Sequence, residues 1–589
     1  MTGTLGRDEH GGVPSHDRPD RTDPPNWRLD AVYSTARPHH LSVSPQRDRL
    51  AFVLSWEETS DLWLLDEGRV TTDRELTAFW EDTPPLWSPD GSRLAYSSGG
   101  AVWVVPVAGG PPKRLTEGSP AAWIDDTTLA ITVERDRSTR LATIGIEDPW
   151  PRPLGPRGTD IGKVLVGPDG VLVVESWPRE DRNRCDLLAV TEDEWSVLVS
   201  IPDRRATLGS LHGRRLAFLL EEEEWRALYV LELGTEGHEP LAKAEGDFGS
   251  VQWDDGDRLV ATLTHRGRSD LVLVDGGVHT LAEGGSWQDP QWYRDGIVAV
   301  HESSTSPMRI VYLEGPSQRP LYDGAPIAVR RAPHAAAEAV RFSSGDGTEI
   351  EGFLYRPRDT GHPVPAVVYP HGGPTSHYGD EWDGHAQYFV DKGYAWLAIN
   401  FRGSTSYGLS FERANHGDWG VGDVEDCIAA ARYLASLGWV DPGRIAIYGA
   451  SYGSYLALAS LVHPDNPFAC GVAKYGDCDI LTSWAQGDRP GSDDLERMMG
   501  HPSSAREAYR RGSPIHSVSR LDRPILIAHG ERDARVHPKQ SEELVAELRR
   551  LGKTYEYVTY PTEGHGLLRR EPHLHFYRRL ERFLDWHLI

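Results

Sequence analysis

The stretch RIAIYGASYGSYLALASLV (residues 444–462) decides the fold of the C-terminal half of the chain. RIAIYG is typical of a buried strand and SYLALASLV of an apolar helix, and G-x-S-x-G, centred on Ser451, lies between them. Small residues permit the sharp strand-to-helix turn that exposes the Ser451 hydroxyl, and a helix N-terminus favours negative charge developing there. In this context the motif predicts a nucleophilic serine, with a chance Gly-rich turn as the alternative.

Short apolar strands alternate with helical stretches around this motif. The predicted strands are 339–344, 350–355, 366–370, 395–400, 444–449, 470–475, 524–530 and 555–560, and the predicted helices include 422–437, 452–462, 538–551 and 573–587. This rhythm predicts an α/β-hydrolase domain, a doubly wound and mostly parallel sheet, over residues 326–589. Ligands of such sheets bind beyond the carboxyl ends of the strands, so functional residues are expected there.

A serine nucleophile needs a base, and the base needs a carboxylate that orients it. In α/β-hydrolases the chain order is Ser, acid, His. Asp533 follows the predicted strand 524–530 and His565 follows the last strand, so we predict Ser451, Asp533 and His565 as the catalytic set. Glu531 is the alternative acid. His529 and His537 are the alternative bases, although His529 is expected to make structural hydrogen bonds and His537 to cap a helix or lie at the surface.

Acyl transfer also requires hydrogen-bond donors for the oxyanion. The backbone N–H of Tyr452, directly after the nucleophile, is the first candidate. The loop after the third strand reads YPHGGP (369–374), and its glycines let backbone approach a substrate carbonyl. We predict the N–H of Gly373 as the second donor, with the N–H of Gly372 as the alternative. The non-functional alternative is that the two glycines only form a turn.

The first half of the chain is built from a repeat. Similar segments centred on Leu50, Leu94, Leu129, Leu172, Leu216, Leu259 and Ile297 recur at spacings of 44, 35, 43, 44, 43 and 38 residues. A period near 40 with several strands in each copy predicts a seven-bladed β-propeller over residues 32–325. A β-sandwich, the alternative, predicts no such regularity. Residues 1–31 are expected to be largely disordered.

Composition narrows the partners and the location. The chain has 62 Lys and Arg against 88 Asp and Glu, a net charge of −26, which disfavours nucleic acid and acidic membranes. Neither a signal-peptide core nor an apolar run of 18 residues is found, and four scattered cysteines fit a reducing compartment, so a cytoplasmic location is predicted. No cofactor is expected, and no His, Cys or Asp cluster has metal-ligand spacing.

The acidic run Glu221 to Glu224 is either an amine-binding pair or, as we favour, a solvated loop tip.

A propeller followed by an α/β-hydrolase resembles the prolyl oligopeptidase family of serine peptidases. The motifs that carry the resemblance are YPHGGP (369–374), NFRGSTSYG (400–408), GDVEDC (422–427), YGASYGSY (448–455), ERMMG (496–500), SPIHSVSRLDRPILIAHGERDARV (513–536) and EGHG (563–566). HGGP, and Arg535 two residues after the acid, are similar to the acylaminoacyl-peptidase and dipeptidyl aminopeptidase-like branch. The resemblance implies that Arg535 binds a substrate carbonyl upstream of the cleaved residue, a role that its five donors suit; a surface arginine is the alternative.

One segment departs from the family. Where a proline-containing segment with aromatics commonly lines the primary specificity pocket, this chain reads KYGDCDILTSW (474–484). Tyr475 is expected to border the pocket, and Lys474, Asp477 and Asp479 place a charged lining near the nucleophile unless they form a polar surface loop. The sequence therefore leaves the side-chain preference open.

The resemblance implies a serine oligopeptidase that cleaves amide bonds near the N-terminus of short peptides through an acyl-enzyme on Ser451. The peptide amine is either acylated or free. A small-molecule esterase or amidase on the same scaffold is the alternative, and a non-catalytic binding protein is disfavoured by the intact Ser, Asp and His set. The resemblance also implies that the propeller caps the site and excludes long chains. Homo-oligomerisation is left open.

Overall fold

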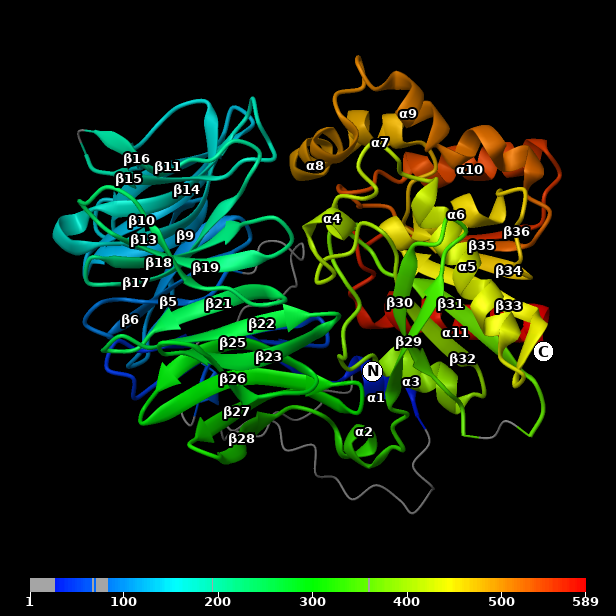
Figure 1. The fold of residues 1–589 in the computed structure, drawn as a ribbon, viewed down its shortest axis with the longest axis horizontal. Coiled ribbons are helices and arrows are strands. Elements are labelled where there is room, and N and C mark those ends of the chain that lie inside the picture. Colours follow the sequence, from blue (N-terminus) through cyan, green and yellow to red (C-terminus); the bar gives the residue numbers. More distant parts are fainter. Residues whose placement is uncertain (1–26, 66–67, 70–82, 193, 359–360) are drawn as a thin grey trace, which may run out of the picture.

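The computed structural model describes residues 27–65, 68–69, 83–192, 194–358 and 361–589. It has an all-β half and an α/β half that lie side by side (Figure 1). Strands β1 to β28 build the first half, and an eight-stranded sheet with its helices builds the second.

The all-β half consists of antiparallel sheets made from consecutive strands. Its strands are β1 (Arg37–Val43), β2 (Leu50–Trp56), β3 (Thr59–Leu64), β4 (Gly68–Arg69), β5 (Leu86–Trp87), β6 (Arg93–Ser98), β7 (Ala101–Pro106), β8 (Lys113–Glu117), β9 (Ser119–Asp125), β10 (Thr128–Arg135), β11 (Ser138–Gly145), β12 (Arg152–Pro153), β13 (Thr159–Val166), β14 (Leu172–Pro178), β15 (Asp186–Val190), β16 (Trp195–Val199), β17 (Ala206–His212), β18 (Arg215–Glu221), β19 (Arg226–Glu232), β20 (Glu239–Ala242), β21 (Asp247–Trp253), β22 (Leu259–His265), β23 (Arg268–Val274), β24 (Val278–Ala282), β25 (Ser286–Tyr293), β26 (Gly296–Ser303), β27 (Ser306–Glu314) and β28 (Ser317–Asp323). This arrangement is that of a β-propeller.

The number of separate blades differs from the predicted seven. Five four-stranded sheets are separate, namely β1–β4, β5–β8, β9–β12, β13–β16 and β17–β20, whereas β21–β28 form one eight-stranded sheet. The reason is a single parallel pairing between Ser269 of β23 and Ser286 of β25, which joins two groups of four strands. In the described part of the chain, the repeat therefore gives five separate blades and one double sheet.

The repeated apolar residues build the cores between neighbouring sheets. Each of the seven anchors lies on the second strand of its group of four, and six of them are at most 1% exposed. Tryptophans tie neighbouring sheets together through their indole N–H groups: Trp87 donates to Ser42 O and Trp123 to Leu86 O, both at 2.9 Å. The sequence repeat thus reflects repeated packing of sheet on sheet.

The α/β half has the eight predicted strands, with small shifts at their ends. They are β29 (Ala337–Ser343), β30 (Glu349–Tyr355), β31 (Val364–Pro370), β32 (Ala395–Asn400), β33 (Val440–Ala450), β34 (Cys470–Lys474), β35 (Ile525–Gly530) and β36 (Tyr555–Tyr560), in the order β29-β30-β32-β31-β33-β34-β35-β36. The pairings β29–β30 and β30–β32 are antiparallel, and all others are parallel. This is the predicted α/β-hydrolase arrangement.

Helices cover both faces of this sheet and create two cores. The helices, including short ones and 3₁₀ turns, are α1 (Leu29–Tyr33), η1 (Pro168–Gly170), α2 (Ile327–Arg331), α3 (Gly384–Asp391), α4 (Leu409–Glu412), α5 (Gly422–Ser436), α6 (Tyr452–Leu461), α7 (Ile480–Gln486), α8 (Arg489–Met499), α9 (Arg506–Arg511), η2 (Pro514–Arg520), α10 (Lys539–Arg550) and α11 (Arg570–Leu588). One core is shared with α5, α6 and α10, and the other with α1, α3 and α11. Side chains alternate between the two faces along each strand, which is why the strands are apolar throughout.

The segment before the propeller differs from the expected disorder over residues 27–31. Trp27 is 4% exposed, packs in the core of the α/β half and donates its indole N–H to Pro333 O at 3.2 Å. Leu29 and Val32 of α1 are buried in the same core. The prediction missed this because two apolar residues after a polar run give little signal on their own. Residues 1–26 lie outside the described residues.

Ion pairs join the two halves at loops that follow the carboxyl ends of hydrolase strands. Glu412 and Arg413 follow β32 and pair with Arg226 and Glu221 of the propeller at 2.7 and 2.8 Å. The propeller therefore covers the edge of the sheet where ligands of such folds bind (Figure 1).

A second cluster of interdomain ion pairs lies on α8. Arg489 pairs with Glu134 at 2.6 Å and with Asp160 at 3.2 Å, and Asp493 pairs with Arg182 at 2.9 Å. Helix α8 follows β34 and α7, so this cluster closes the same edge of the sheet from another side.

The acidic run at the tip of the β18–β19 hairpin is not a uniformly solvated loop. Glu221 is 1% exposed and contacts Arg205, Arg226 and Arg413, while Glu224 accepts from Ser410 Oγ at 2.8 Å. The correction has a physical cause, since the arginines that neutralise Glu221 come from other strands and from the other half of the chain. Glu223 and Glu224 are exposed, as the solvated interpretation expects, although Glu224 also contacts the hydrolase half.

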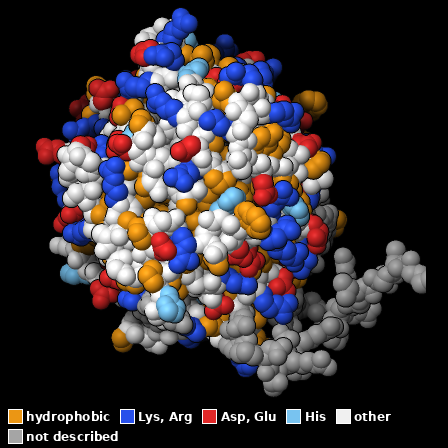
Figure 2. Space-filling view, turned by 90° about the vertical axis from the view of Figure 1, so that its right-hand side faces the viewer, with side chains coloured by type: hydrophobic (Ala, Val, Ile, Leu, Met, Phe, Trp, Pro, Cys, Tyr) orange, Lys and Arg blue, Asp and Glu red, His pale blue; other side chains and the backbone are white. Residues whose placement is uncertain are grey.

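The face of the hydrolase half that is turned away from the propeller carries both signs of charge. Figure 2 shows Lys, Arg, Asp and Glu side chains interspersed across it, so the net charge of −26 is not concentrated there. Within the part of the chain that the structure describes, no helix is both long and apolar enough to span a bilayer.

Candidate active site

The turn between β33 and α6 holds Ser451 in a strained conformation, at φ 54° and ψ −122°. A Cβ on Gly449 would lie 2.2 Å from Gly453 C, and a Cβ on Gly453 would lie 2.1 Å from Pro370 O. Both flanking positions of the motif therefore require glycine, because larger residues would collide with backbone. The turn raises the Ser451 side chain above the carboxyl ends of the strands.

The structure brings the three predicted catalytic residues together. His565 Nδ1 lies 2.7 Å from Asp533 Oδ2, and His565 Nε2 lies 3.0 Å from Ser451 Oγ. The carboxylate can only accept, so Nδ1–H donates to it, and Nε2 is left to accept the Ser451 hydroxyl proton. This is the geometry that general-base activation of a serine requires.

Asp533 is 2% exposed and held by its own loop. Its Oδ1 accepts from the N–H groups of Arg535 and Val536 at 3.0 and 2.9 Å. Burial raises the pKa of Asp533, but hydrogen bonds from His529 and His565 outweigh burial and hold it at about 2. The carboxylate is therefore ionised at neutral pH and can stabilise an imidazolium at His565.

The rivals of Asp533 and His565 have other environments. His529 is fully buried, contacts Ser541 Oγ and Val536 O at 2.6 and 2.9 Å, and lies 3.5 Å from Asp533 Oδ2. It thus supports the acid in addition to its expected structural role. Glu531 is exposed and accepts from Thr559.

The predicted oxyanion donors lie on the nucleophile turn itself and on the loop that follows β31. Tyr452 is the first residue of α6, where backbone N–H groups have no acceptor within the helix. Gly372 approaches Ser451 closely, since a Cβ on it would lie 3.5 Å from Ser451 Cβ, and Gly373 has φ 128°. Gly373 is therefore favoured by its conformation, whereas a Cβ on Gly372 would meet only ordinary van der Waals contacts.

His371, which sequence reasoning did not single out, fixes this loop. Its Nδ1 lies 2.6 Å from Gly372 O, so it donates to that carbonyl, and its ring stacks on Phe401. Burial lowers the pKa of His371 to about 4, so the ring is neutral at pH 7. Gly372 O and Gly373 N–H belong to one trans peptide and point in opposite directions, so this hydrogen bond sets the direction of the predicted donor.

Arg535 and Tyr475, the predicted substrate-binding residues, both lie beside the triad. Arg535 Nε donates to Asp488 Oδ2 at 3.0 Å, which ties it to the segment before α8. The ring of Tyr475 is centred 4.6 Å from that of His565. Tyr475 is 8% exposed with φ 45°, an unusual conformation for a residue with a side chain.

The charged residues of segment 474–484 do not all line the nucleophile. Lys474 points to the α11 face, with its Nζ about 5 Å from the ring centres of Tyr475, Phe576 and Tyr577. Burial lowers its pKa to about 7. Asp479 caps α7 by accepting from Leu481 N. The triad residues His565 and Asp533 are among the charges that act on Asp477.

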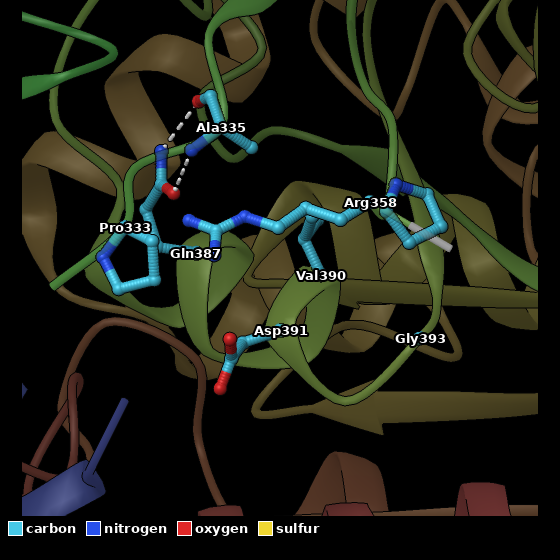
Figure 3. Close-up of a pocket in the computed structure, with 8 residues that line it drawn as sticks. Pro333, Ala335, Arg358, Gln387, Val390, Asp391 and Gly393 are labelled. Atoms are coloured by element: carbon cyan, nitrogen blue, oxygen red, sulfur yellow. Dashed lines mark hydrogen bonds between the residues drawn. The ribbon is translucent and has the colours of Figure 1, made fainter. Parts of the chain in front are cut away.

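A separate pocket of about 170 Å³ lies between α3 and the segments before and after β29 and β30 (Figure 3). Its lining residues are Pro333, Ala335, Pro357, Arg358, Gln387, Val390, Asp391 and Gly393. The Gln387 amide exchanges two hydrogen bonds with the backbone of Ala335, at 2.8 Å each. None of these residues belongs to the predicted site. Over the described residues, no group of three or more His, Cys, Asp or Glu is arranged to hold a metal ion.

Known proteins resemble the part of the chain that holds the predicted catalytic residues. Residues 380–589, which include Ser451, Asp533 and His565, match the prolyl oligopeptidase family. The match lies within the α/β half of the chain. A curated relative, dipeptidyl aminopeptidase BIII of Pseudoxanthomonas mexicana, is 31% identical over 285 residues, which are 46% of this chain and 40% of the relative. The matched stretch thus spans less than half of that relative's length.

Solved structures resemble almost all of the chain. A puromycin-hydrolyzing peptidase of Mycobacterium tuberculosis superposes with a TM-score of 0.83 at 20% identity, covering 97% of this chain and 98% of that one. The acylaminoacyl peptidase of Pyrococcus horikoshii superposes with a TM-score of 0.77 at 21% identity, covering 96% and 98%. At this identity the likeness shows the fold, a propeller domain followed by a hydrolase domain.

Proposed function

We propose that this chain is a serine peptidase that hydrolyses amide bonds near the N-terminus of short peptides through an acyl-enzyme on Ser451. The observation that carries the proposal is the unbroken series of hydrogen bonds from Ser451 through His565 to Asp533. The family match over residues 380–589 supports the reaction class.

In the proposed reaction, Ser451 Oγ attacks the substrate carbonyl while His565 Nε2 takes the hydroxyl proton. Asp533 stays ionised and stabilises the imidazolium, as its low pKa favours. His565 then gives the proton to the leaving amine, which departs as the C–N bond breaks and leaves an ester on Ser451. A water molecule, deprotonated by His565, hydrolyses this ester and restores the serine.

The N–H groups of Tyr452 and Gly373 are the proposed donors to the oxyanion of each tetrahedral intermediate. His371, through its bond to Gly372 O, is the proposed positioning residue for the second donor. Tyr475 is proposed to border the pocket beside His565, and Arg535 to bind a substrate carbonyl on the acyl side.

We further propose that the propeller counts seven blades, two of them joined in the sheet β21–β28, and that its strands lie within residues 32–325, while α1 and residues 326–589 form the hydrolase half. The support is that all seven repeat anchors occupy the second strand of a group of four. Because the interdomain ion pairs hold this disc over the strand ends, entry is proposed to favour short peptides. The relatives include a dipeptidyl aminopeptidase and acylaminoacyl peptidases, which supports cleavage near an N-terminus. A cytoplasmic location and the oligomeric state stay predictions.

The test combines labelling with matched substrates. A fluorophosphonate should label Ser451 stoichiometrically, and Ser451→Ala should lose at least about 10⁴-fold in amidase rate while keeping its fold by circular dichroism. Chromogenic peptide amides that differ only in acetylation of the amine decide between an acylated and a free N-terminus. Retained activity in purified Ser451→Ala would end the serine-hydrolase proposal.

A simple ester addresses the alternative of a small-molecule esterase. The peptidase proposal expects kcat/KM for a dipeptidyl or tripeptidyl amide to exceed that for an unsubstituted acetyl amide of the same leaving group. Rapid hydrolysis of simple esters without measurable turnover of any peptide amide would favour the esterase instead.

A further inference from the structure

The segment that follows β34 is packed directly against the nucleophile turn. A Cβ on Gly476 would lie 2.4 Å from Ser454 Oγ and 2.7 Å from Ser451 O, so only glycine fits there. Tyr475 N–H donates to Ala528 O at 2.7 Å and anchors the start of the segment to β35. The next residue, Asp477, is therefore held beside the base of the nucleophile turn.

Gln540 fixes the other end of the same segment. Its Oε1 accepts from the N–H groups of Cys478 and Asp479 at 2.8 and 2.9 Å, and its Nε2 donates to Asp479 O at 2.9 Å. Gln540 is fully buried, so these bonds are protected from water. Residues on both sides of Asp477 are thus anchored, and its side chain is preorganised by the backbone.

The Asp477 carboxylate is incompletely satisfied. Its Oδ1 is inaccessible to solvent and has no hydrogen-bond partner, and no ion pair with a Lys or Arg is found for it among the described residues. Burial raises the pKa of Asp477 to about 6, although a hydrogen bond with Ser483 and the charge of His565 act to lower it. Asp477 is only partly buried as a residue, so a cationic substrate group that pairs with its carboxylate would offset the cost of the oxygen that has no donor.

The nearby charged groups have other partners. The Lys474 ammonium lies among aromatic rings on the opposite face of the sheet. Arg535 is hydrogen-bonded to Asp488, and Asp479 caps α7 and accepts from Thr482 Oγ1 at 2.7 Å. Asp477 is therefore the group in this segment that combines proximity to the triad with an unused acceptor.

We propose that Asp477 determines the side-chain preference of the site, by selecting peptides whose residue on the acyl side of the cleaved bond carries a positively charged side chain. This inference rests on the proposed peptidase function and deepens it. The guanidinium of an arginine substrate presents planar donors suited to a carboxylate, and a lysine ammonium presents a compact charge. Charged hydrogen bonds in buried sites correspond to a preference of about 10- to 150-fold over an uncharged isostere.

The first experiment compares coumarin amides of one short peptide that differ only at the residue before the cleaved bond. Arginine is compared with citrulline, its neutral isostere, and lysine with norleucine, with active enzyme counted by fluorophosphonate titration. The wild-type chain should prefer each charged member by at least about tenfold in kcat/KM. Asp477→Asn should abolish the preference, so that the ratio of kcat/KM for arginine over citrulline, and for lysine over norleucine, falls to about one. Asp479→Asn, which keeps a side chain able to cap α7, is the matched control and should retain the preference.

The second experiment needs no variant and covers the case in which Asp477→Asn fails to fold. Benzamidine and benzamide, a cation and its neutral analogue, are compared as competitive inhibitors of the wild-type chain. Benzamidine should bind at least about tenfold more tightly.

The outcomes separate this inference from the proposed function. Equal rates for arginine and citrulline, or a preference that survives in folded Asp477→Asn, would overturn the role of Asp477 while Ser451 labelling and peptide hydrolysis stand. A chain that neither reacts with fluorophosphonate nor hydrolyses any amide would instead overturn the proposed function, and this inference with it.

Discussion

Glu412→Gln should weaken the closure of the propeller over the site without touching the catalytic residues. Glu412 is 3% exposed and accepts from Arg226 Nη2 at 2.7 and 3.0 Å across the domain boundary. Breaking a buried ion pair costs about 3–5 kcal/mol. Glutamine keeps the side-chain volume and one hydrogen-bond acceptor, and Arg226 keeps its ion pair with Asp247 at 3.1 Å. We therefore expect the substitution to weaken the contact between the two halves by about 2–3 kcal/mol. That loss corresponds to a shift of about 30- to 150-fold towards the open arrangement.

The assay is a length series of one peptide with a single cleavable site, from about 6 to 40 residues. In the wild-type chain kcat/KM should fall steeply with length, because the interdomain contacts restrict entry. In Glu412→Gln the ratio of the 40-residue rate to the 6-residue rate should rise at least about tenfold, with the short peptide changed less than about twofold. Glu507→Gln, which removes an exposed pair with Arg510 on α9, is the control and should leave the ratio unchanged. An unchanged ratio in Glu412→Gln, with a lowered unfolding midpoint, would show that these ion pairs stabilise the fold without governing entry.

Three other predictions concern single positions. His371→Ala should lower kcat by up to about 100-fold with little change in KM, because Gly373 N–H loses its fixed direction; equal effects on both constants would argue against a positioning role. Burial raises the pKa of Glu302 to about 8 from 4.5, so the folded chain keeps a proton that the unfolded chain releases, and stability should fall as pH rises between these values. Glu302→Gln should flatten this fall, measured as the unfolding midpoint from pH 5 to 8, whereas an unchanged slope would assign it to other groups. Arg535→Ala should raise KM for peptides but not for a simple ester, and equal losses on both would remove its proposed carbonyl-binding role.

The closeness of Ser451, Asp533 and His565 could be predicted because each follows a strand whose pattern is clear. The strand 444–449, the turn at Ser451 and the loops that carry Asp533 and His565 are local features, and chain order assigns their roles. The side of the sheet to which the Lys474 side chain points could also have been predicted. Residues 470, 472 and 474 alternate onto the face covered by α11, a consequence of strand geometry that the sequence analysis did not use.

The interdomain contacts could not be predicted in the same way. Glu221 and Arg413 are 192 residues apart and belong to different halves of the chain, so no local pattern relates them. The same holds for the parallel pairing of Ser269 with Ser286, which depends on how two neighbouring groups of strands approach each other. Such features follow from the docking of already formed elements, which a repeat period does not encode.

The burial of Trp27 in the hydrolase core has a mechanical consequence. The chain starts its described part in the hydrolase half, crosses to the propeller before β1 and returns after β28, so the propeller is an insertion with two tethers. The two crossings touch, since Ala36 N–H donates to Gly324 O at 3.3 Å. Two adjacent tethers act as a hinge: they allow the halves to rotate apart about one edge and oppose sliding or separation. The ion pairs of α8 with Glu134, Asp160 and Arg182 must then break for the two halves to open about this hinge.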